Sequence, residues 1–280
     1  MDRVDAGCQR PAGRDSPPQL MAREIALVTG ASSGIGEALA RRLARDGRNL
    51  GLVARRAERL EALASELRAA NRIEVDVLPA DLIQPGAVAA LVAELGRRGL
   101  DVDWLVNNAG FGTVGRFHTL PVARELEEIA LNVEALVELT GRLLPQMVRR
   151  RSGAVMNVAS IGAYLPSPNM ATYTATKAFV LSFTEAIAVE LLDTGVRVLC
   201  VCPGVTRTEF QERAHVDTGY VPAFVQQTAD EVADEAVLAM GRGPVVVNGM
   251  LNRITVGALK FVPHGLVTRI AGGLIRPQEN

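Results

Sequence analysis

Lysine, cysteine and histidine are scarce in this chain of 280 residues, and each scarcity narrows what it can be. Only Lys177 and Lys260 are lysines among the 30 basic residues, so arginine supplies nearly all of the positive charge. The three cysteines, Cys8, Cys200 and Cys202, do not make a disulfide framework, and the last two read as packing residues of a buried strand. The three histidines are scattered without the spacing of metal ligands, so we expect no structural metal.

Long apolar runs and a strong net charge are also missing. The net charge of −1 gives no general attraction to nucleic acid, and no uninterrupted apolar run is long enough to span a membrane. Residues 1–22 are rich in Arg, Gly, Pro and Asp and have no signal-peptide core, so we expect a disordered extension and a cytoplasmic protein. A start at Met21 is an alternative explanation of this segment.

The chain is organised around a glycine-rich turn between a predicted strand at 25–28 and a predicted helix. Gly30 permits a tight turn, Gly34 lets the backbone approach a phosphate, and Gly36 lets helix and strand pack closely. The helix N-terminus then offers free N–H groups to a pyrophosphate, with Ser32, Ser33 and Ile35 beside it. A turn that binds nothing is the alternative, because the G-x-x-x-G-x-G spacing differs from the commonest dinucleotide fingerprint.

Strands and helices alternate along the rest of the chain, which predicts one Rossmann-like domain over 23–248. This alternation is typical of an α/β fold with a doubly wound parallel sheet and helices on both faces. Ligands bind beyond the carboxyl ends of the strands in such sheets. The remaining predicted strands are at 49–54, 74–79, 104–106, 154–160, 196–201 and 244–247, with predicted helices at 87–95, 122–150 and 171–192.

The end of the second predicted strand indicates which dinucleotide is bound. An acidic residue there usually holds the ribose 2′-hydroxyl of NAD, whereas an arginine accommodates the 2′-phosphate of NADP. Here Ala54 is followed by Arg55, so the sequence favours NADP. A solvated surface arginine is the alternative reading.

Tyr173 and Lys177 are four residues apart on a predicted helix, so they share one face. A nearby cation stabilises a phenolate, and we expect Lys177 to bring the pKa of Tyr173 from about 10 toward 7. Ser160 follows a predicted strand, and its hydroxyl would donate to a substrate carbonyl. Asn132 lies inside a predicted helix, where asparagine has low propensity, so we expect it to bond backbone or water near the site.

Together these motifs resemble the short-chain dehydrogenase/reductase family, over about residues 24–247. The resemblance implies that Tyr173 is the proton donor, Lys177 its partner, Ser160 the group that polarises the carbonyl, and Asn132 a residue that steadies a relay water. It also implies a cofactor site for NADP (NADPH). The residues of that site are Gly30, Ser32, Ser33, Gly34, Ile35, Gly36, Arg55, Asp81, Leu82, Asn108, Ala109, Gly110, Tyr173, Lys177, Pro203, Gly204, Thr206 and Thr208.

The implied reaction is hydride transfer between nicotinamide and a small-molecule carbonyl or secondary alcohol. The residues expected on the substrate side are apolar, which favours an acyl- or steroid-like molecule: Phe111, Ala163, Tyr164, Leu165, Met170, Val205 and Phe210. The resemblance also implies a homodimer or homotetramer. A non-catalytic dinucleotide sensor on the same fold is the competing hypothesis, because fold alone does not fix function.

Residues 249–280 form a tail whose role stays open. Leu266, Ile270 and Leu274 are spaced as one apolar stripe on a short helix. The stripe has three possible destinations: the subunit's own pocket, a partner subunit, or a membrane surface. The first two are favoured, because the tail follows the last predicted strand and so begins near the substrate side.

Overall fold

The computed structural model describes residues 22–214, 225–259, 261–262, 265 and 268. Residues 1–21 of the predicted extension lie outside this part of the chain. So do Leu266, Ile270 and Leu274 of the predicted tail stripe. These two predictions are therefore untested by the structure.

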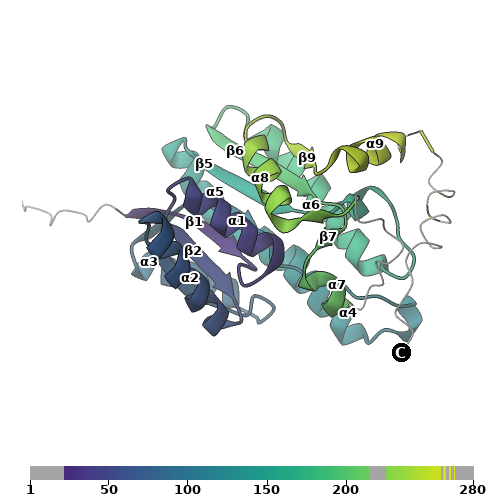
Figure 1. Ribbon diagram of the computed structural model, residues 1–280, viewed down its shortest axis with the longest axis horizontal. Coiled ribbons are helices and arrows are strands. Elements are labelled where there is room, and N and C mark those ends of the chain that lie inside the picture. Colours follow the sequence, from purple (N-terminus) through teal and green to yellow (C-terminus); the bar gives the residue numbers. More distant parts are fainter. Residues whose placement is uncertain (1–21, 215–224, 260, 263–264, 266–267, 269–280) are drawn as a thin grey trace, which may run out of the picture.

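A parallel sheet of seven strands forms the centre of the described chain, as predicted (Figure 1). The strand order is β3-β2-β1-β4-β5-β6-β9, so the chain reverses its direction of travel across the sheet between β3 and β4. A second, smaller sheet consists of two parallel strands of two residues each. The strands of the main sheet are β1 (Arg23–Thr29), β2 (Leu50–Ala54), β3 (Val75–Pro79), β4 (Leu100–Asn107), β5 (Gly153–Val158), β6 (Val196–Cys202) and β9 (Val245–Val247), and those of the small sheet are β7 (Thr206–Arg207) and β8 (Gln227–Thr228).

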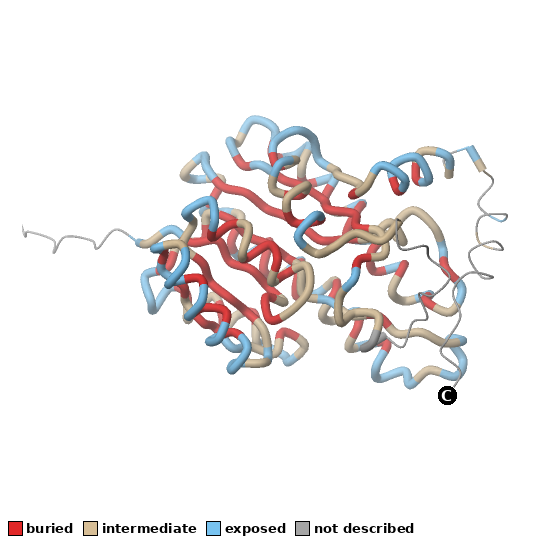
Figure 2. Tube along the Cα trace, viewed as in Figure 1, coloured by how far each residue is buried: buried red, intermediate tan, exposed pale blue. Residues whose placement is uncertain are grey.

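Helices cover both faces of the sheet, because strand residues bury their side chains alternately on either side. Ala26 and Val28 pack in one core cluster, whereas Ile25 and Leu27 pack in the other. Figure 2 shows the buried residues concentrated along the strands and the inner sides of the helices. One face is covered by α1 (Gly34–Arg45), α2 (Ala57–Asn71) and α8 (Ala229–Ala239), the other by α3 (Ala87–Arg97), α5 (Ala135–Arg150) and α6 (Ala171–Glu190).

The predicted helix over 122–150 is helical throughout but not uniform. It consists of α4 (Val122–Ile129), a π-helical segment at Ala130–Glu134, and α5. Asn132 lies in the π-helical segment. Such segments are rare and frequently lie at functional sites, and here the segment separates α4 from the core-packed α5.

Short helices follow several strand ends, and the last described helix lies on the site side of the sheet. α9 (Met250–Leu259) buries Asn252 and Val256, and a Cβ placed on Gly204 would lie 2.3 Å from the Asn252 amide nitrogen. The beginning of the predicted tail therefore packs on the loop after β6. The other short helices are η1 (Phe117–Thr119), η3 (Ile161–Tyr164) and α7 (Glu209–Ala214).

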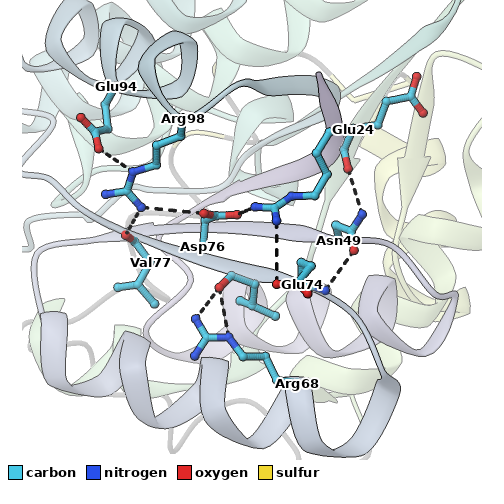
Figure 3. Close-up of polar contacts among 10 residues, drawn as sticks. Glu24, Asn49, Arg68, Glu74, Asp76, Val77, Glu94 and Arg98 are labelled. Carbon is cyan, nitrogen blue, oxygen red and sulfur yellow. Dashed lines mark hydrogen bonds and ion pairs between the residues drawn. The ribbon is translucent and has the colours of Figure 1, made fainter. Parts of the chain in front are cut away.

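A network of ion pairs fastens the amino-terminal half of the sheet, away from the strand ends that carry the motifs (Figure 3). Asp76 of β3 pairs with Arg23 of β1 and lies 3.8 Å from Arg98, which follows α3. Arg98 also pairs with Glu94 and donates to the carbonyl of Val77. These contacts join β1, β3 and the end of α3 toward the amino-terminal ends of the strands. The motif residues lie at the opposite, carboxyl ends of the strands.

The turn after β1 is packed against the end of β4 without room for a side chain. A Cβ on Gly36 would lie 2.3 Å from the Gly30 carbonyl oxygen and 2.3 Å from the Asn108 amide nitrogen. A Cβ on Gly30 would lie 2.9 Å from the Ala109 Cα atom, and Gly30 also has φ +67°. The glycines therefore set how closely α1, β1 and the loop after β4 approach each other.

We predict that Gly36→Ala lowers the free energy of unfolding by about 3 kcal/mol or more, because backbone would have to move to admit the methyl group. Gly96→Ala is the matched control. Gly96 is exposed in α3 with nothing within 4 Å of its Cβ position, so alanine there should stabilise the protein by about 0.5–1 kcal/mol. Urea unfolding measures both changes, and equal stability of the two variants would contradict the packing argument.

Candidate active site

The predicted site residues follow the carboxyl ends of neighbouring strands, where the topology brings them together. Because all seven strands are parallel, these ends lie along one edge of the sheet. In doubly wound sheets the point where the strand order reverses marks the crevice that takes the ligand, and here that point lies between β1 and β4. The residues that follow the strand ends are Gly30 after β1, Arg55 after β2, Asp81 and Leu82 after β3, Asn108 to Gly110 after β4, Ser160 after β5, and Pro203 and Gly204 after β6.

The glycine-rich turn leads directly into the N-terminus of α1, as the sequence predicted. Gly34 begins the helix with φ +59°, and Ser33 at the N-cap makes no side-chain capping bond. The first N–H groups of α1 are therefore not capped by a side chain, which is the arrangement that binds a phosphate. A Cβ on Gly34 would lie 3.1 Å from the Thr208 methyl group, so Thr208 forms the opposite wall.

Thr206 and Thr208 shape the chain after β6. The Thr206 hydroxyl donates to the Gly204 carbonyl, 3.1 Å away. The Thr208 hydroxyl accepts from the Phe210 backbone N–H at 3.2 Å, at the start of α7. Both threonines therefore order the segment that faces the glycine-rich turn.

Arg56, which is not among the residues predicted from the sequence, is the arginine that reaches this turn. Its guanidinium donates to the Ser32 hydroxyl at 2.9 Å and to the Ser33 hydroxyl at 3.0 Å, whereas Arg55 is exposed. The sequence shows two consecutive arginines after β2. Which of the two side chains points to the glycine-rich turn depends on the direction of the backbone at the start of α2.

Glu209 of α7 connects the opposite wall to the same arginine. Its carboxylate lies 3.2 Å from the Arg56 guanidinium and also pairs with Arg59 of α2. The segment after β6 is thereby fastened across the crevice to the segment after β2.

Asn108 and Ala109 hold the end of β4 to the end of β1. The Thr29 hydroxyl accepts from the backbone N–H groups of both residues at 3.0 Å and donates to the Val106 carbonyl. The Asn108 side chain donates to the Thr29 carbonyl at 2.9 Å. Asn108 therefore shapes the crevice with its side chain.

Asp81 and Leu82 lie just after β3, at the outer end of the crevice. The Asp81 carboxylate accepts from the Ile83 backbone N–H and from the Gln84 side chain, and Leu82 is buried. The carboxylate thus shapes the turn that follows β3.

Ser160 and Tyr173 are brought together, as predicted. The Ser160 hydroxyl accepts from the Gly162 N–H at 3.0 Å, which fixes it at the start of η3. Burial raises the pKa of Tyr173 to about 12, while a hydrogen bond with Ser160 acts to lower it. The shift is opposite in direction to the expectation that Lys177 brings this pKa toward 7, because desolvation of the phenolate and the neighbouring Glu128 raise the pKa by more than the Ser160 hydrogen bond lowers it.

Lys177 is buried beneath the phenol. Its ammonium lies 5.8 Å from the centre of the Tyr173 ring and donates to the Val158 carbonyl at 2.9 Å. Burial lowers the pKa of Lys177 to about 8. The ammonium is thus directed to the end of β5, and a Cβ on Gly110 would come within 3.5 Å of it.

Asn132 holds the loop after β4. Its side-chain oxygen accepts from the Phe111 N–H at 3.1 Å, and its amide nitrogen donates to the Phe111 carbonyl and to the Thr176 hydroxyl of α6. The expected bond to backbone is therefore present. The Asn132 side chain joins the π-helical segment to the loop after β4 and to α6.

The surroundings of the Tyr173 ring are apolar. Tyr173 packs against Met170 together with Val114 and Phe210, and the Phe210 ring centre lies 5.3 Å from that of Tyr173. Of the other residues expected to face substrate, Tyr164 is turned toward the Cys202 thiol.

The described part of the chain has neither a cluster of metal ligands nor a membrane-spanning helix. In that part of the chain no group of three or more His, Cys, Asp or Glu side chains is arranged to hold a metal ion. None of the described helices is both long and apolar enough to cross a membrane.

The comparisons with known proteins agree with this geometry. A model of the short chain dehydrogenase family matches residues 24–218. Sulfoacetaldehyde reductase 2 of Chromohalobacter salexigens is 39% identical over 189 residues, which are 67% of this chain and 74% of that protein.

Two solved structures extend the similarity over most of the chain. One, described as giving insights into 7β-hydroxysteroid dehydrogenase stereoselectivity, has a TM-score of 0.82 and 30% identity over 90% of this chain and 97% of its own. The other, a short-chain dehydrogenase from Sphingobium yanoikuyae in complex with NADPH, has a TM-score of 0.77 and 34% identity over 92% and 98%.

These matches support an enzyme and give no support to a non-catalytic sensor. The chain belongs to the short-chain dehydrogenase/reductase family and is an oxidoreductase.

Proposed function

We propose that this enzyme is an NADP(H)-dependent reductase or dehydrogenase of apolar ketones and secondary alcohols, with Tyr173 as the acid and base. The observation that carries the proposal is the position of Tyr173, between the Ser160 hydroxyl and the buried Lys177 ammonium. A bound nicotinamide would supply or accept the hydride, and the remaining tasks fall to the chain's own residues.

The residues of the crevice fit a dinucleotide. The N-terminus of α1 has no side-chain cap, so its first N–H groups are available to a phosphate, and Thr208 packs against Gly34 at the start of the helix. Gly30, Ile35, Gly36, Ala109, Gly110 and Pro203 complete the predicted cofactor wall together with Asp81 and Leu82.

Tyr173 is suited to protonate a carbonyl oxygen as the carbon is reduced. With a pKa of about 12 the phenol keeps its proton at neutral pH, so it donates it to the developing alkoxide. The Ser160 hydroxyl, held by the Gly162 N–H, donates to the same oxygen and stabilises its charge. The Lys177 ammonium stabilises the phenolate that remains.

The apolar residues around Tyr173 support an apolar substrate. Tyr173, Val114 and Phe210 pack against Met170, and these apolar side chains offer contact area without hydrogen-bond partners. Similarity to the structure that concerns a 7β-hydroxysteroid dehydrogenase favours a bulky, steroid-like molecule.

Exposed apolar side chains on α5 and α6 support a homodimer or homotetramer. Val137 of α5 and Phe179 and Val189 of α6 are each at least a third exposed. Apolar side chains gathered on adjacent helices are common at interfaces between subunits.

We predict that Tyr173→Phe lowers kcat for ketone reduction by about 10²–10⁴-fold, because the ring stays while its proton is lost. The Kd for NADPH should change little. Tyr164→Phe removes the same hydroxyl group nine residues upstream, where it faces Cys202, and should keep most of the turnover. Retention of turnover by Tyr173→Phe would mean that another group provides the proton.

We predict that Arg56, held against Ser32 and Ser33, selects the 2′-phosphate of NADPH. Arg56→Ala should weaken NADPH binding by about ten- to a hundredfold, as expected for a charge-assisted contact, and should leave the Kd for NADH unchanged. Arg55→Ala is the matched control and should have about threefold effect or less, because an exposed charge contributes little. The reverse order of the two variants would return the assignment to Arg55.

We also predict that Glu209→Gln tightens NADPH binding by about two- to fivefold, because the Glu209 carboxylate now occupies part of the Arg56 guanidinium. Binding of NADH should stay the same, since it has no 2′-phosphate to compete with the carboxylate. Titration of the variant with both dinucleotides measures the difference. Equal shifts for both would show that Glu209 acts on the fold of the crevice and not on the phosphate.

A further inference from the structure

Two buried carboxyl groups lie one turn apart on α4, next to the site but outside the proposed reaction. Glu125 is 4% exposed and Glu128 is 0% exposed. Burial of two carboxylates side by side is costly unless hydrogen bonds and protons compensate for it.

Both carboxyl groups contact one hydroxyl. The Thr113 Oγ1 atom lies 2.6 Å from Glu125 Oε1 and 2.9 Å from Glu128 Oε2. A hydroxyl has one hydrogen to donate. If both carboxyls were ionised, one of these contacts would join two oxygen lone pairs with no hydrogen between them. The geometry therefore requires one proton on the pair.

The other contacts place that proton on Glu128. Glu125 Oε2 accepts a second hydroxyl, from Thr172, so both of its oxygens are supplied with donors and its charge is stabilised. Glu128 Oε2 accepts the Thr113 backbone N–H at 2.9 Å, but Glu128 Oε1 is buried and has no hydrogen-bond partner among the described residues. A negative charge on Glu128 would leave that oxygen unsolvated.

We propose that Glu128 is a neutral carboxylic acid and a positioning residue for Tyr173, donating its proton to the Thr113 hydroxyl, which donates in turn to ionised Glu125. This inference rests on the proposed role of Tyr173 as the acid. The chain of donors runs in one direction, from Glu128 through Thr113 to Glu125, with Thr172 donating from the other side.

The cluster holds Tyr173 from two sides. Thr172 precedes Tyr173 in the first turn of α6, so its bond to Glu125 fixes the start of that helix. Thr113 follows Gly112, whose Cβ position would lie 2.8 Å from the Tyr173 ring. The backbone that packs on the ring is therefore held by the same two carboxyl groups.

The charged and titratable groups that face Glu128 are Glu125 on its own helix and Lys177 and Tyr173 on α6. Burial, with a smaller contribution from Glu125, raises the pKa of Glu128 from its ordinary 4.5 to about 7, although the Thr113 donors and the Lys177 charge act to lower it. Above about pH 7 the second carboxylate forms, and its repulsion of Glu125 opens the bridge through Thr113.

The variants that test this are Glu128→Gln, which removes the ionisation, and Glu127→Gln as its matched control. Glu127 is the neighbouring residue, partly exposed and paired with Arg124. The pKa of Glu128 is raised in the folded state. The free energy of unfolding of the wild type relative to Glu128→Gln should therefore be highest below pH 4.5, fall progressively up to about pH 7, and stay constant above that pH. Glu127→Gln should follow the wild type throughout.

Infrared difference spectroscopy detects the proton directly and needs no turnover. Below pH 7 the wild type and Glu127→Gln should show the carbonyl stretch of a neutral carboxylic acid, which fades as the pH rises through about 7, and Glu128→Gln should lack it. Absence of the band in the wild type, or its persistence in Glu128→Gln, would overturn the proposal. If Glu128→Gln does not fold, the wild-type titration alone still decides.

The kinetic readout is the pH profile of kcat. The wild type and Glu127→Gln should show a decline with an apparent pKa near 7, and Glu128→Gln should lose this limb while keeping any limb from Lys177 near pH 8. A profile of Glu128→Gln that matches the wild type would show that the acid does not position Tyr173. Failure of Tyr173 as the acid would appear instead in the turnover of Tyr173→Phe, with the infrared band unchanged.

Discussion

The contact between the turn after β1 and the end of β4 is the constraint on which the rest of the site depends. Gly36 leaves no space between α1 and the Gly30 carbonyl, and the Thr29 hydroxyl accepts from two N–H groups of the neighbouring loop. The two strands at the reversal of the sheet order are thereby held in register just beyond their hydrogen-bonded ends. This places the helix N-terminus and the loop that carries Gly110 on opposite sides of one crevice.

Burial decides the electrostatics within that crevice. Desolvation raises the pKa of Tyr173, raises that of Glu128 and lowers that of Lys177, so each group is displaced toward its neutral form. A neutral phenol beside the Ser160 hydroxyl is consistent with the proposed role of Tyr173 as proton donor, because reduction of a carbonyl requires a proton. In that proposal the lysine acts on the product of proton transfer, the phenolate, more than on the resting phenol.

The sequence predicted the sheet, the order of the motifs and the meeting of Ser160 with Tyr173, because apolar strand runs and the glycine, proline and asparagine residues at strand ends are local signals. It did not predict that Arg56 turns inward in place of Arg55, since that depends on how α2 begins. Nor did it predict the desolvation of Tyr173, because the pKa of a group depends on neighbours from several elements. It did not predict the burial of Glu125 and Glu128 around the Thr113 hydroxyl either, because that contact joins α4 to the loop after β4.

The distribution of charge follows from these contacts and limits the substrate. Near Tyr173 the ionised Glu125 and the Lys177 ammonium offset each other, and a neutral Glu128 adds nothing, so the region around the phenol has no excess charge. Positive charge gathers instead at the far end of the crevice, on Arg56 and Arg59, where Glu209 only partly compensates it. This distribution supports the proposal of an uncharged, apolar carbonyl compound at one end and a phosphorylated ribose at the other. Met170 and Phe210 offer hydrophobic contact beside the phenol, so burial of a charged group against them would cost free energy.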